Sequence, residues 1–238
     1  MAYCTTQGIV LRRSDWREND RVLTLLTPNR GRVEAAARGA RKLKSPLLNA
    51  TELCTLGEYV LYQGKGHEIV SSFTLIDAFY PIRLDAVKLS HAALMLRASE
   101  AVAQKDKEAR HLFILLERSL KRLCEDSFDS AAVTSAFLLH FSAIEGFKPR
   151  LNHCAACLKP MGEDEPGWLS ASTGGVLCAD CRKNAQDARR IAPDSLRWLR
   201  TVLVSGIEKA APAPPPLVAM ISYVRYQIDA PLPDILML

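Results

Sequence analysis

Two pairs of cysteines lie in the second half of the chain at the spacing that structural zinc sites require. Cys154 and Cys157 form one C-x-x-C pair, and Cys178 and Cys181 form a second, with twenty residues between them. Two thiolates three residues apart can occupy one edge of a coordination tetrahedron from a single tight turn, and two such turns complete it. Because four thiolates leave no position for water, the spacing predicts one Zn²⁺ with an architectural role.

Two other chemistries remain open for these cysteines, namely two disulfides or four free thiols. The segment 1–7 has neither the charged nor the apolar region of a secretory signal, so we expect a reducing cytoplasm, which disfavours disulfides. Exposed free thiols are prone to oxidation. His153 is an alternative ligand in place of a neighbouring cysteine. Cys4, Cys54 and Cys124 have no partner at ligand spacing, and we expect them to be small buried residues or bystanders.

Positive charge is concentrated in one short segment. The chain carries 31 Lys and Arg against 26 Asp and Glu, a net charge of +5, which is too small for a protein that coats DNA through its overall charge. Six positive charges fall within fifteen residues and are opposed only by Glu34: Arg30, Arg32, Arg38, Arg41, Lys42 and Lys44. Such a run is suited to binding a phosphate backbone without reading sequence. The alternative interpretation is an ordinary solvated face.

Strand alternation places part of this charge on one face. Arg32 and Arg38 alternate with small apolar residues, so we expect both on the outer surface of a sheet, leading into a basic loop. The DNA contacts predicted in this region are Arg32, Arg38, Arg41, Lys42 and Lys44. A second cluster follows the last cysteine and adds four predicted contacts: Arg182, Lys183, Arg189 and Arg190. For this cluster the alternative is a set of charges at a solvated helix end.

Aromatic side chains near the basic segment are candidates for base stacking. Stacking on an OB-type surface contributes about 1–3 kcal/mol per base. Tyr59 and Phe73 lie in apolar runs, so we expect both inside the core. Trp16 lies in a polar segment, where an exposed stacking position and a packed position are both open.

The first eighty residues have the pattern of a small β-barrel. Apolar, β-rich runs are separated by turn signals such as those at 27–31 and 64–67. Five strands in this length suit a closed OB-fold barrel, because closure leaves no strand edge unpaired. The expected strands span residues 8–11, 22–27, 32–38, 59–63 and 68–76, with a polar connection over 14–20.

Beyond about Pro81 the apolar period changes from two to 3.6, which predicts amphipathic helices. The expected helices span 85–103, 112–123, 133–144 and 193–203, with a last short helix beginning at 217 after a proline-rich connector over 210–216. We therefore predict an α+β protein in four parts. These are an OB-fold DNA-binding domain over 1–80, a helical bundle over 81–149, a zinc module over 150–190, and C-terminal helices over 191–238 that pack on the helical domain.

Sequence motifs for catalysis are missing from the chain. It has no phosphate loop, no dinucleotide-binding fingerprint and no nucleophile elbow. The H-x-E element that accompanies C-x-x-C in zinc deaminases is missing as well. No run of about 18 apolar residues is present to span a bilayer. These observations favour a cytoplasmic protein that is not an enzyme and that has no membrane anchor and no small-molecule substrate.

The N-terminal pattern resembles that of the RecO family of bacterial DNA repair proteins. The resemblance rests on the runs 8–11, 18–27, 31–32 and 37–41, and on the order of barrel, helices, four-cysteine module and final helices. It implies a recombination mediator that binds single- and double-stranded DNA and anneals complementary strands. It also implies two protein partners: RecR, with which the mediator loads RecA onto DNA covered by the single-stranded DNA-binding protein SSB, and the acidic C-terminal tail of SSB.

The sequence therefore leads to a main hypothesis and two rivals. The main hypothesis is a nucleoid-associated mediator whose barrel and zinc module contact phosphates without reading sequence. The first rival is a zinc-containing protein-interaction adaptor that does not bind DNA directly and whose basic loop faces an acidic protein. The second rival is a nuclease, which cleavage of labelled DNA in the presence of Mg²⁺ or Mn²⁺ would reveal.

Overall fold

The computed structural model describes residues 3–64, 66–206, 209 and 213–235, and these form two compact units. The first unit contains residues 3–125 and 233–235, and the second contains residues 126–232. Part of the predicted proline-rich connector, residues 210–212, lies outside the described residues. The division into four segments predicted from the sequence stays a prediction about which parts fold independently.

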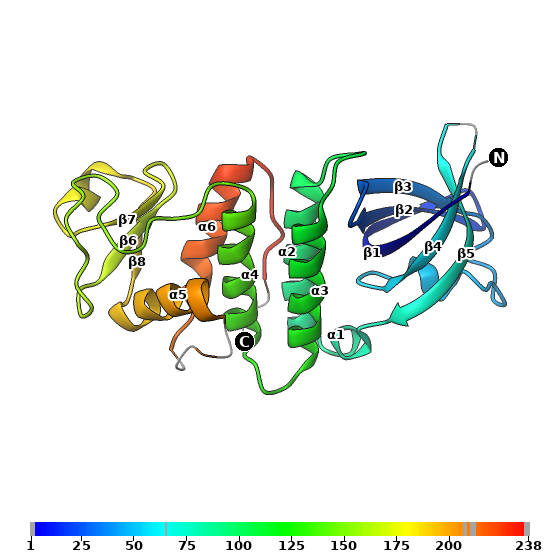
Figure 1. Ribbon diagram of the computed structural model, residues 1–238. Coiled ribbons are helices and arrows are strands. Elements are labelled where there is room, and N and C mark those ends of the chain that lie inside the picture. The colour runs from blue at the N-terminus through cyan, green and yellow to red at the C-terminus, as the bar shows by residue number, and fades with distance from the viewer. Residues whose placement is uncertain (1–2, 65, 207–208, 210–212, 236–238) are drawn as a thin grey trace. The chain divides into compact units, whose positions relative to one another are not determined.

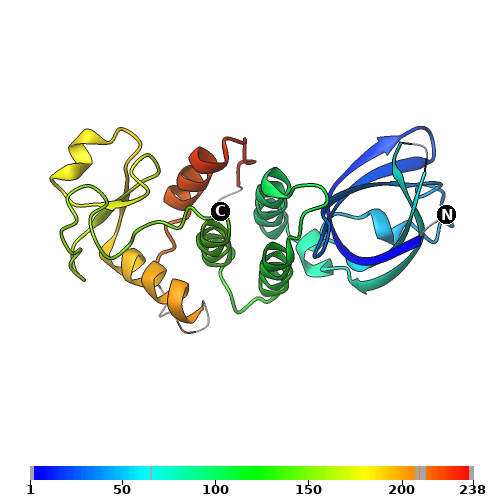
Figure 2. The ribbon, with the colours of Figure 1, turned by 45° about the horizontal axis from the view of Figure 1, so that its top comes forward.

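The first unit begins with a closed five-stranded barrel, as the sequence predicts. The strands are β1 (Tyr3–Trp16), β2 (Asp20–Thr27), β3 (Gly31–Ala37), β4 (Leu56–Gln63) and β5 (Glu68–Asp77). Their order around the barrel is β1-β2-β3-β5-β4, and β4 pairs with β1 to close it. All neighbours are antiparallel except β3 and β5, which pair in parallel at one short stretch. Figures 1 and 2 show the strands wrapped around a common interior.

Strand β1 is longer than the sequence pattern predicts, because it pairs with two strands in succession. Its first half pairs with β4 and its second half with β2, and Ile9 has a partner on both sides. An irregularity between Val10 and Arg12 bends the strand at this point. The polar residues expected in a connection over 14–20 therefore continue β1 as far as Trp16. Only residues 17–19 form the turn.

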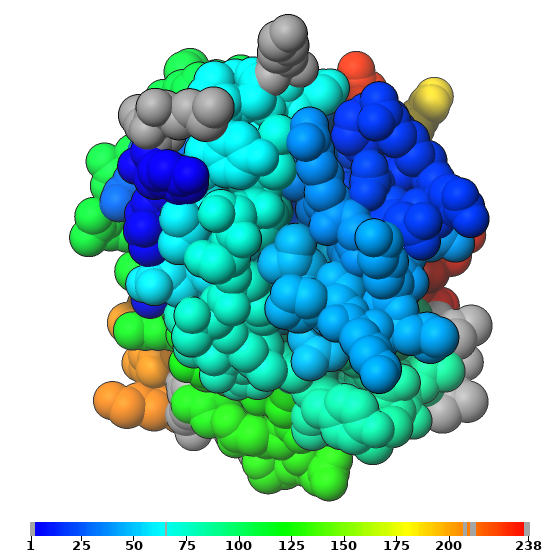
Figure 3. Space-filling view, turned by 90° about the vertical axis from the view of Figure 1, so that its right-hand side faces the viewer, coloured from blue at the N-terminus to red at the C-terminus, as the bar shows by residue number. Residues whose placement is uncertain are grey.

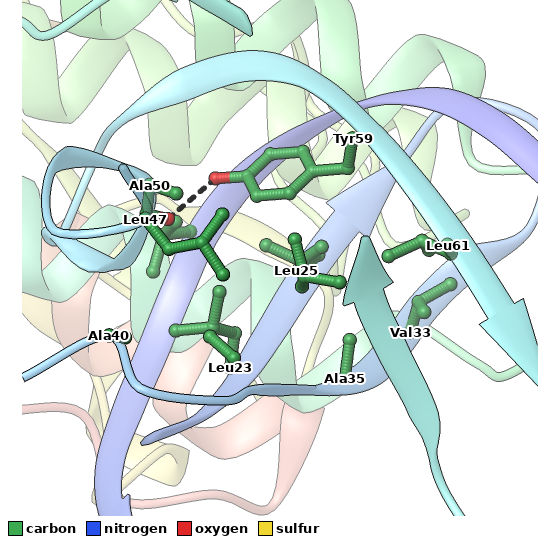
Figure 4. Close-up of a cluster of buried hydrophobic side chains, with 12 residues drawn as sticks. Leu23, Leu25, Val33, Ala35, Ala40, Leu47, Ala50, Tyr59 and Leu61 are labelled. Atoms are coloured by element: carbon green, nitrogen blue, oxygen red, sulfur yellow. Dashed lines mark hydrogen bonds between the residues drawn. The ribbon is translucent and has the colours of Figure 1, made fainter. Parts of the chain in front are cut away.

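The barrel interior is filled from both its strands and the segment between β3 and β4. Figure 4 shows Leu23, Leu25, Val33, Ala35 and Leu61 pointing into this core together with Tyr59. Ala40, Leu47 and Ala50 from the connecting segment are buried in the same cluster. The Tyr59 hydroxyl is fully buried and donates to the Ala50 carbonyl oxygen at 2.8 Å. The hydrogen bond satisfies a polar group that would otherwise be costly to bury, so the connecting segment is part of the fold.

Three helices complete the first unit: α1 (Tyr80–Leu84), α2 (Ala86–Val102) and α3 (Arg110–Cys124). Two of them match the expected spans, and the short α1 was not expected. Asp85 ends α1 and is the N-cap of α2. Its carboxylate accepts hydrogen bonds from the backbone N–H groups of Val87 and Lys88. Helix α2 lies against β1, where Arg12 pairs at 2.8 Å with the buried carboxylate of Glu100.

The second unit combines helices with a small three-stranded sheet. Its elements are α4 (Ser130–Ile144), β6 (Gly167–Ser170), β7 (Gly175–Leu177), β8 (Arg189–Ile191), α5 (Pro193–Ser205) and α6 (Leu217–Ile228). The sheet order is β7-β6-β8. Helix α6 packs on α4, and the Tyr223 hydroxyl donates to the Phe147 carbonyl oxygen at 2.9 Å. No helix in the described residues is both long and apolar enough to cross a membrane.

The β2–β3 turn is clamped to the loop between α2 and α3. The Arg32 N–H donates to the Gln104 carbonyl oxygen at 3.1 Å, and the Asp106 N–H donates to the Arg30 carbonyl oxygen at 3.0 Å. Gly31, between these bonds, has a φ of +57°, which favours glycine. A Cβ at Gly31 would lie 2.2 Å from the Gln104 carbonyl oxygen. The clamp therefore fixes the start of β3 against the helical part of the same unit.

Replacing Gly31 with alanine should lower the free energy of unfolding of the first unit by about 2 kcal/mol or more, because backbone strain and a steric clash coincide. Gly39→Ala is the matched control. Gly39 has a similar φ of +66°, but its nearest neighbour is the Lys42 side chain at 3.7 Å. Urea unfolding followed by circular dichroism measures both variants. Equal destabilisation by the two substitutions would contradict the clamp.

Candidate nucleic-acid interface and metal centre

The basic segment that follows β3, residues 38–44, is anchored to the barrel by a buried residue and by backbone hydrogen bonds. Ala40 is buried in the core, while the Gly39 N–H donates to an Asp20 carboxylate oxygen at 2.8 Å. The Arg41 N–H donates to the Asn19 carbonyl oxygen at 3.1 Å. The segment between β3 and β4 therefore follows the β1–β2 turn closely. Figure 3 shows this segment on the barrel surface beside strand β5.

Three predicted DNA contacts project from this segment with their charge available. The side chains of Arg38, Lys42 and Lys44 are exposed, and in the described part of the chain none of them forms an ion pair with an acidic side chain. Arg41 differs, because its guanidinium lies 3.5 Å from the Asp15 carboxylate. Its charge is thus partly offset within the protein.

Arg30, the first residue of the basic run, is engaged within the fold. Its guanidinium forms a two-pronged pair with the Glu68 carboxylate and lies 3.5 Å from the Asp106 carboxylate. The hydrogen bond to Glu68 raises the pKa of Arg30 above its ordinary value. Arg30 therefore links β5 to the loop between α2 and α3, and its charge is already paired within the protein.

Two open clefts on the barrel surface are each lined by several cations. The turn cleft, about 470 Å³, is lined by Arg17, Glu18, Asn19, Asp20, Arg38, Gly39 and Lys42. The hairpin cleft, about 280 Å³, is lined by Arg30, Arg32, Val33, Glu34, Gln63, Gly66, His67, Glu68 and Lys105. Arg38 and Lys42 therefore lie together, whereas Arg32 lies in the other cleft.

Two cations in these clefts, Arg17 and Lys105, were not among the residues predicted from the sequence. Arg17 comes from the β1–β2 turn and Lys105 from the loop between α2 and α3. Neither belongs to a basic run, so the sequence pattern does not indicate them as DNA contacts. Only pairing across the barrel and the clamp at Gly31 bring them beside the predicted contacts.

Tyr59 and Phe73 both pack in or against the barrel core, where the sequence predicts them. Tyr59 is fully buried, and burial raises the pKa of its hydroxyl. Phe73 is partly buried against the same core, with its ring 4.9 Å from that of Tyr59. The Tyr59 ring therefore offers no surface to a ligand. Trp16, at the end of β1, remains half-buried at the surface.

The four paired cysteines converge on one point in the second unit. Their sulfur atoms all lie within 4.8 Å of one another, and the Cys157 and Cys178 sulfurs are 3.9 Å apart. A tetrahedral Zn²⁺ with bonds of about 2.3 Å separates its sulfur ligands by about 3.8 Å. The cysteines are therefore positioned to bind a metal ion. In the described part of the chain, His153 is not part of this group.

Tight backbone turns hold each cysteine pair in place. The Cys154 N–H donates to the Lys159 carbonyl oxygen at 2.8 Å, and the Leu158 N–H donates to the Cys154 carbonyl oxygen at 2.9 Å. Leu158 adopts a φ of +65°, which closes this turn. In the second pair, the Arg182 N–H donates to the Cys178 carbonyl oxygen at 3.1 Å. These turns are the local structure that the C-x-x-C spacing predicts.

The thiols influence one another's ionisation. Burial opposes ionisation of Cys154, but backbone N–H groups of Cys157, Cys178 and Ala156 lower its pKa to about 6. Hydrogen bonds to the sulfurs of Cys178 and Cys157 raise the pKa of Cys181 to about 12. Four adjacent thiolates repel each other unless a cation lies between them, so this donor set fits a divalent metal ion.

The second basic cluster lies on the same module, in the stretch that follows Cys181. Arg182, Lys183, Arg189 and Arg190 are all exposed. The Arg182 guanidinium lies over the Trp168 ring, 4.9 Å from its centroid, and Arg190 on β8 is paired with Trp168 on β6. Trp168 therefore provides the surface on which part of this charge is arranged.

Asp187 fastens the chain between these basic residues to the sheet. Its carboxylate accepts hydrogen bonds from the Ser172 N–H at 2.9 Å, the Ser172 hydroxyl at 2.7 Å and the Ser170 hydroxyl at 2.9 Å. Burial opposes ionisation of this carboxyl group, but the hydrogen bonds prevail and lower the pKa of Asp187. The basic cluster is thus tied to β6 through an anion.

Comparison with known families gives a match on each side of residue 80. Residues 1–79 match the family described as "Recombination protein O N terminal". Residues 83–225 match the family described as "Recombination protein O C terminal". The first match spans the barrel, and the second spans the helices and the cysteine module.

Individual relatives agree with the family matches. The chain is 33% identical to "DNA repair protein RecO" of Frankia casuarinae, over 83% of this chain and 80% of the relative. It is 30% identical to the protein of the same name from Acetivibrio thermocellus, over 86% and 81% of the two chains. For the Thermoanaerobacter sp. protein, again called DNA repair protein RecO, the identity is 27% over 88% and 83%.

Replacing Asp187 with asparagine should lower the free energy of unfolding of the second unit at neutral pH by about 1–3 kcal/mol, because hydrogen bonds to a charged acceptor are lost. A lowered pKa means that this contribution is complete above the ordinary value of 3.8 and is lost as the pH falls through the folded-state value. The difference from wild type should therefore shrink in acid. Urea unfolding at several pH values measures it, with the exposed Asp180→Asn as control. A difference that is constant with pH would contradict the proposed role of the carboxylate.

Proposed function

Because the chain belongs to the RecO family of DNA repair proteins, we propose that it is a non-enzymatic recombination mediator that binds single- and double-stranded DNA without sequence specificity. The predicted contacts in the first unit are Arg32, Arg38, Arg41, Lys42 and Lys44. Those in the second unit are Arg182, Lys183, Arg189 and Arg190. In this proposal the protein acts in the cytoplasm at the nucleoid.

One observation carries the proposal: Arg38, Lys42 and Lys44 are exposed cations without an acidic partner among the described residues, on a segment that the barrel core holds in place. Phosphates would be bound without first breaking an ion pair. Because the anchoring is to backbone and core, little further ordering is needed when DNA binds. Contacts of this kind give affinity and orientation but no sequence readout.

Strand annealing follows from the same charge. Two complementary strands repel each other through their phosphates, and a basic surface lowers that repulsion so that base pairing can proceed without ATP. In this proposal the protein acts with RecR to load RecA onto DNA covered by SSB, and it binds the acidic C-terminal tail of SSB. The rival is a zinc-containing adaptor whose basic segment faces an acidic protein instead of DNA.

Replacing Arg38, Lys42 and Lys44 together with alanine should weaken binding of a single-stranded oligonucleotide and flatten its salt dependence. Each lost phosphate contact reduces the slope of log affinity against log salt by about 0.7, so three contacts reduce it by about 2. Fluorescence anisotropy at several salt concentrations measures the slope. The same variant should anneal complementary strands more slowly than wild type, with and without SSB on the strands.

The charge-matched control replaces Arg110, Arg118 and Lys121, three exposed cations of α3, with alanine. This control removes the same net charge and should leave the slope close to that of wild type. An unchanged slope in the barrel variant, or an equal reduction in the control, would contradict the assignment. If the wild-type protein binds no DNA, the adaptor is favoured.

We propose further that the metal held by Cys154, Cys157, Cys178 and Cys181 is one zinc ion. When bound, zinc would supply a cross-link between the two cysteine turns and would leave no open coordination position. The segment between the turns is rich in glycine and short in apolar residues, so its fold depends on such a cross-link. The metal is architectural in this proposal.

Elemental analysis of protein purified without added metal should find one zinc per chain. Cys178→Ser should lose the metal and lower the melting temperature of the second unit, because three thiolates hold zinc less tightly than four. Cys124→Ser removes a half-buried cysteine outside the cluster and should keep the metal. A wild-type protein with no zinc and four titratable thiols at these positions would overturn this assignment.

A further inference from the structure

Trp16 presents a partly exposed aromatic ring at the tip of the β1–β2 hairpin. It is the last residue of β1 and pairs with Asp20, the first of β2. The Arg17 guanidinium lies over the indole, 4.6 Å from the ring centroid. The His67 ring meets the indole edge-on, with centroids 6.4 Å apart and planes at 72°. An aromatic ring at the surface is thus flanked by two side chains that can carry positive charge.

The neighbours of Trp16 belong to the two clefts of the barrel surface. Arg17, which covers the indole, also lines the turn cleft with Arg38 and Lys42. His67, which meets the indole edge, also lines the hairpin cleft with Arg32 and Lys105. Trp16 therefore lies between the clefts. No ion pair is found in the described residues for the five cations Arg17, Arg32, Arg38, Lys42 and Lys105.

Some acidic side chains in the clefts are already engaged within the protein. Asp20 accepts the Gly39 N–H in the turn cleft, and Glu68 is paired with Arg30 in the hairpin cleft. The clefts also contain Glu18 and Glu34. The phosphate-binding capacity of each cleft therefore comes from its unpaired cations.

We propose that Trp16 stacks on a base of single-stranded DNA whose phosphates pass from the turn cleft to the hairpin cleft. The inference rests on the proposed DNA binding and adds the mode of recognition. Arg32 is the second residue of β3 and Arg38 directly follows its last residue, six residues or about 20 Å further along the extended chain, which leaves room for a base between the two phosphate contacts. Binding moves the Arg17 guanidinium from the indole to a phosphate, and the freed ring face receives the base.

This arrangement discriminates between forms of DNA. The bases of a single strand are free to stack on a side chain, whereas those of a duplex are already stacked within it. The phosphates are available in both forms. Loss of the indole should therefore weaken single-strand binding selectively, while loss of a cleft cation should weaken both.

The experiment compares the affinities of the full-length wild type, Trp16→Ala and Trp16→Phe for a fluorescein-labelled oligothymidylate and for a labelled duplex of the same length, by anisotropy. Trp16→Ala should lose about tenfold in single-strand affinity and less than twofold in duplex affinity, and Trp16→Phe should keep most of both. Unchanged binding by Trp16→Ala, or an equal loss on both probes, overturns the stacking contact. Wild-type protein that binds neither probe overturns the proposed DNA binding itself.

Two further measurements guard against misfolding of Trp16→Ala. Unlabelled oligothymidylate should quench tryptophan fluorescence in the wild type, and the quenching should be smaller in Trp16→Phe, which retains Trp168 and Trp198. Lys105→Ala should reduce the salt slope by about 0.7, whereas Arg118→Ala on α3, which removes the same charge, should not. Quenching in Trp16→Phe that equals that of the wild type, or an unchanged slope in Lys105→Ala, contradicts this path.

Discussion

The surface chemistry of the first unit depends on how the segment between β3 and β4 is anchored. Ala40, Leu47 and Ala50 fill one part of the barrel core, and the Tyr59 hydroxyl donates to the Ala50 carbonyl oxygen at 2.8 Å. Without these contacts the segment would be a mobile basic loop, and the loss of conformational entropy on ordering it would oppose the proposed binding of DNA. With them, Arg38 and its neighbours form a positioned cationic surface.

In the cysteine module of the second unit, converging cysteines and hydrogen bonds to Asp187 position the basic residues in a comparable way. The four sulfur atoms lie within 4.8 Å of one another, so the two cysteine turns of the module converge. Asp187 then ties the following basic residues to β6 through Ser170 and Ser172. In each unit, buried residues or hydrogen bonds to a carboxylate fix the position of the exposed basic residues. The net charge of the chain does not indicate where either basic surface lies.

Much of this organisation could be predicted from the sequence, because it is encoded locally. Alternation between Arg32 and Arg38 predicts their common face on β3, and the C-x-x-C spacing predicts the convergence of the cysteines. What depends on distant segments could not be predicted. Pairing of β1 with both β2 and β4 extends that strand to Trp16. The clamp at Gly31 brings Lys105 to the barrel surface. The ion pair with Glu68 occupies the Arg30 guanidinium, so its charge is not available to bind phosphate.

The central claim is that DNA binds the barrel surface formed by the β1–β2 turn and the segment after β3. Hydrogen–deuterium exchange of the full chain, with and without saturating oligothymidylate, tests it most directly. Amide exchange should be slower in residues 15–20 and 38–44 when the oligonucleotide is bound, with α3 (Arg110–Cys124) unchanged. Bound oligonucleotide that leaves both barrel segments unprotected, with slower exchange only elsewhere in the chain, would contradict it.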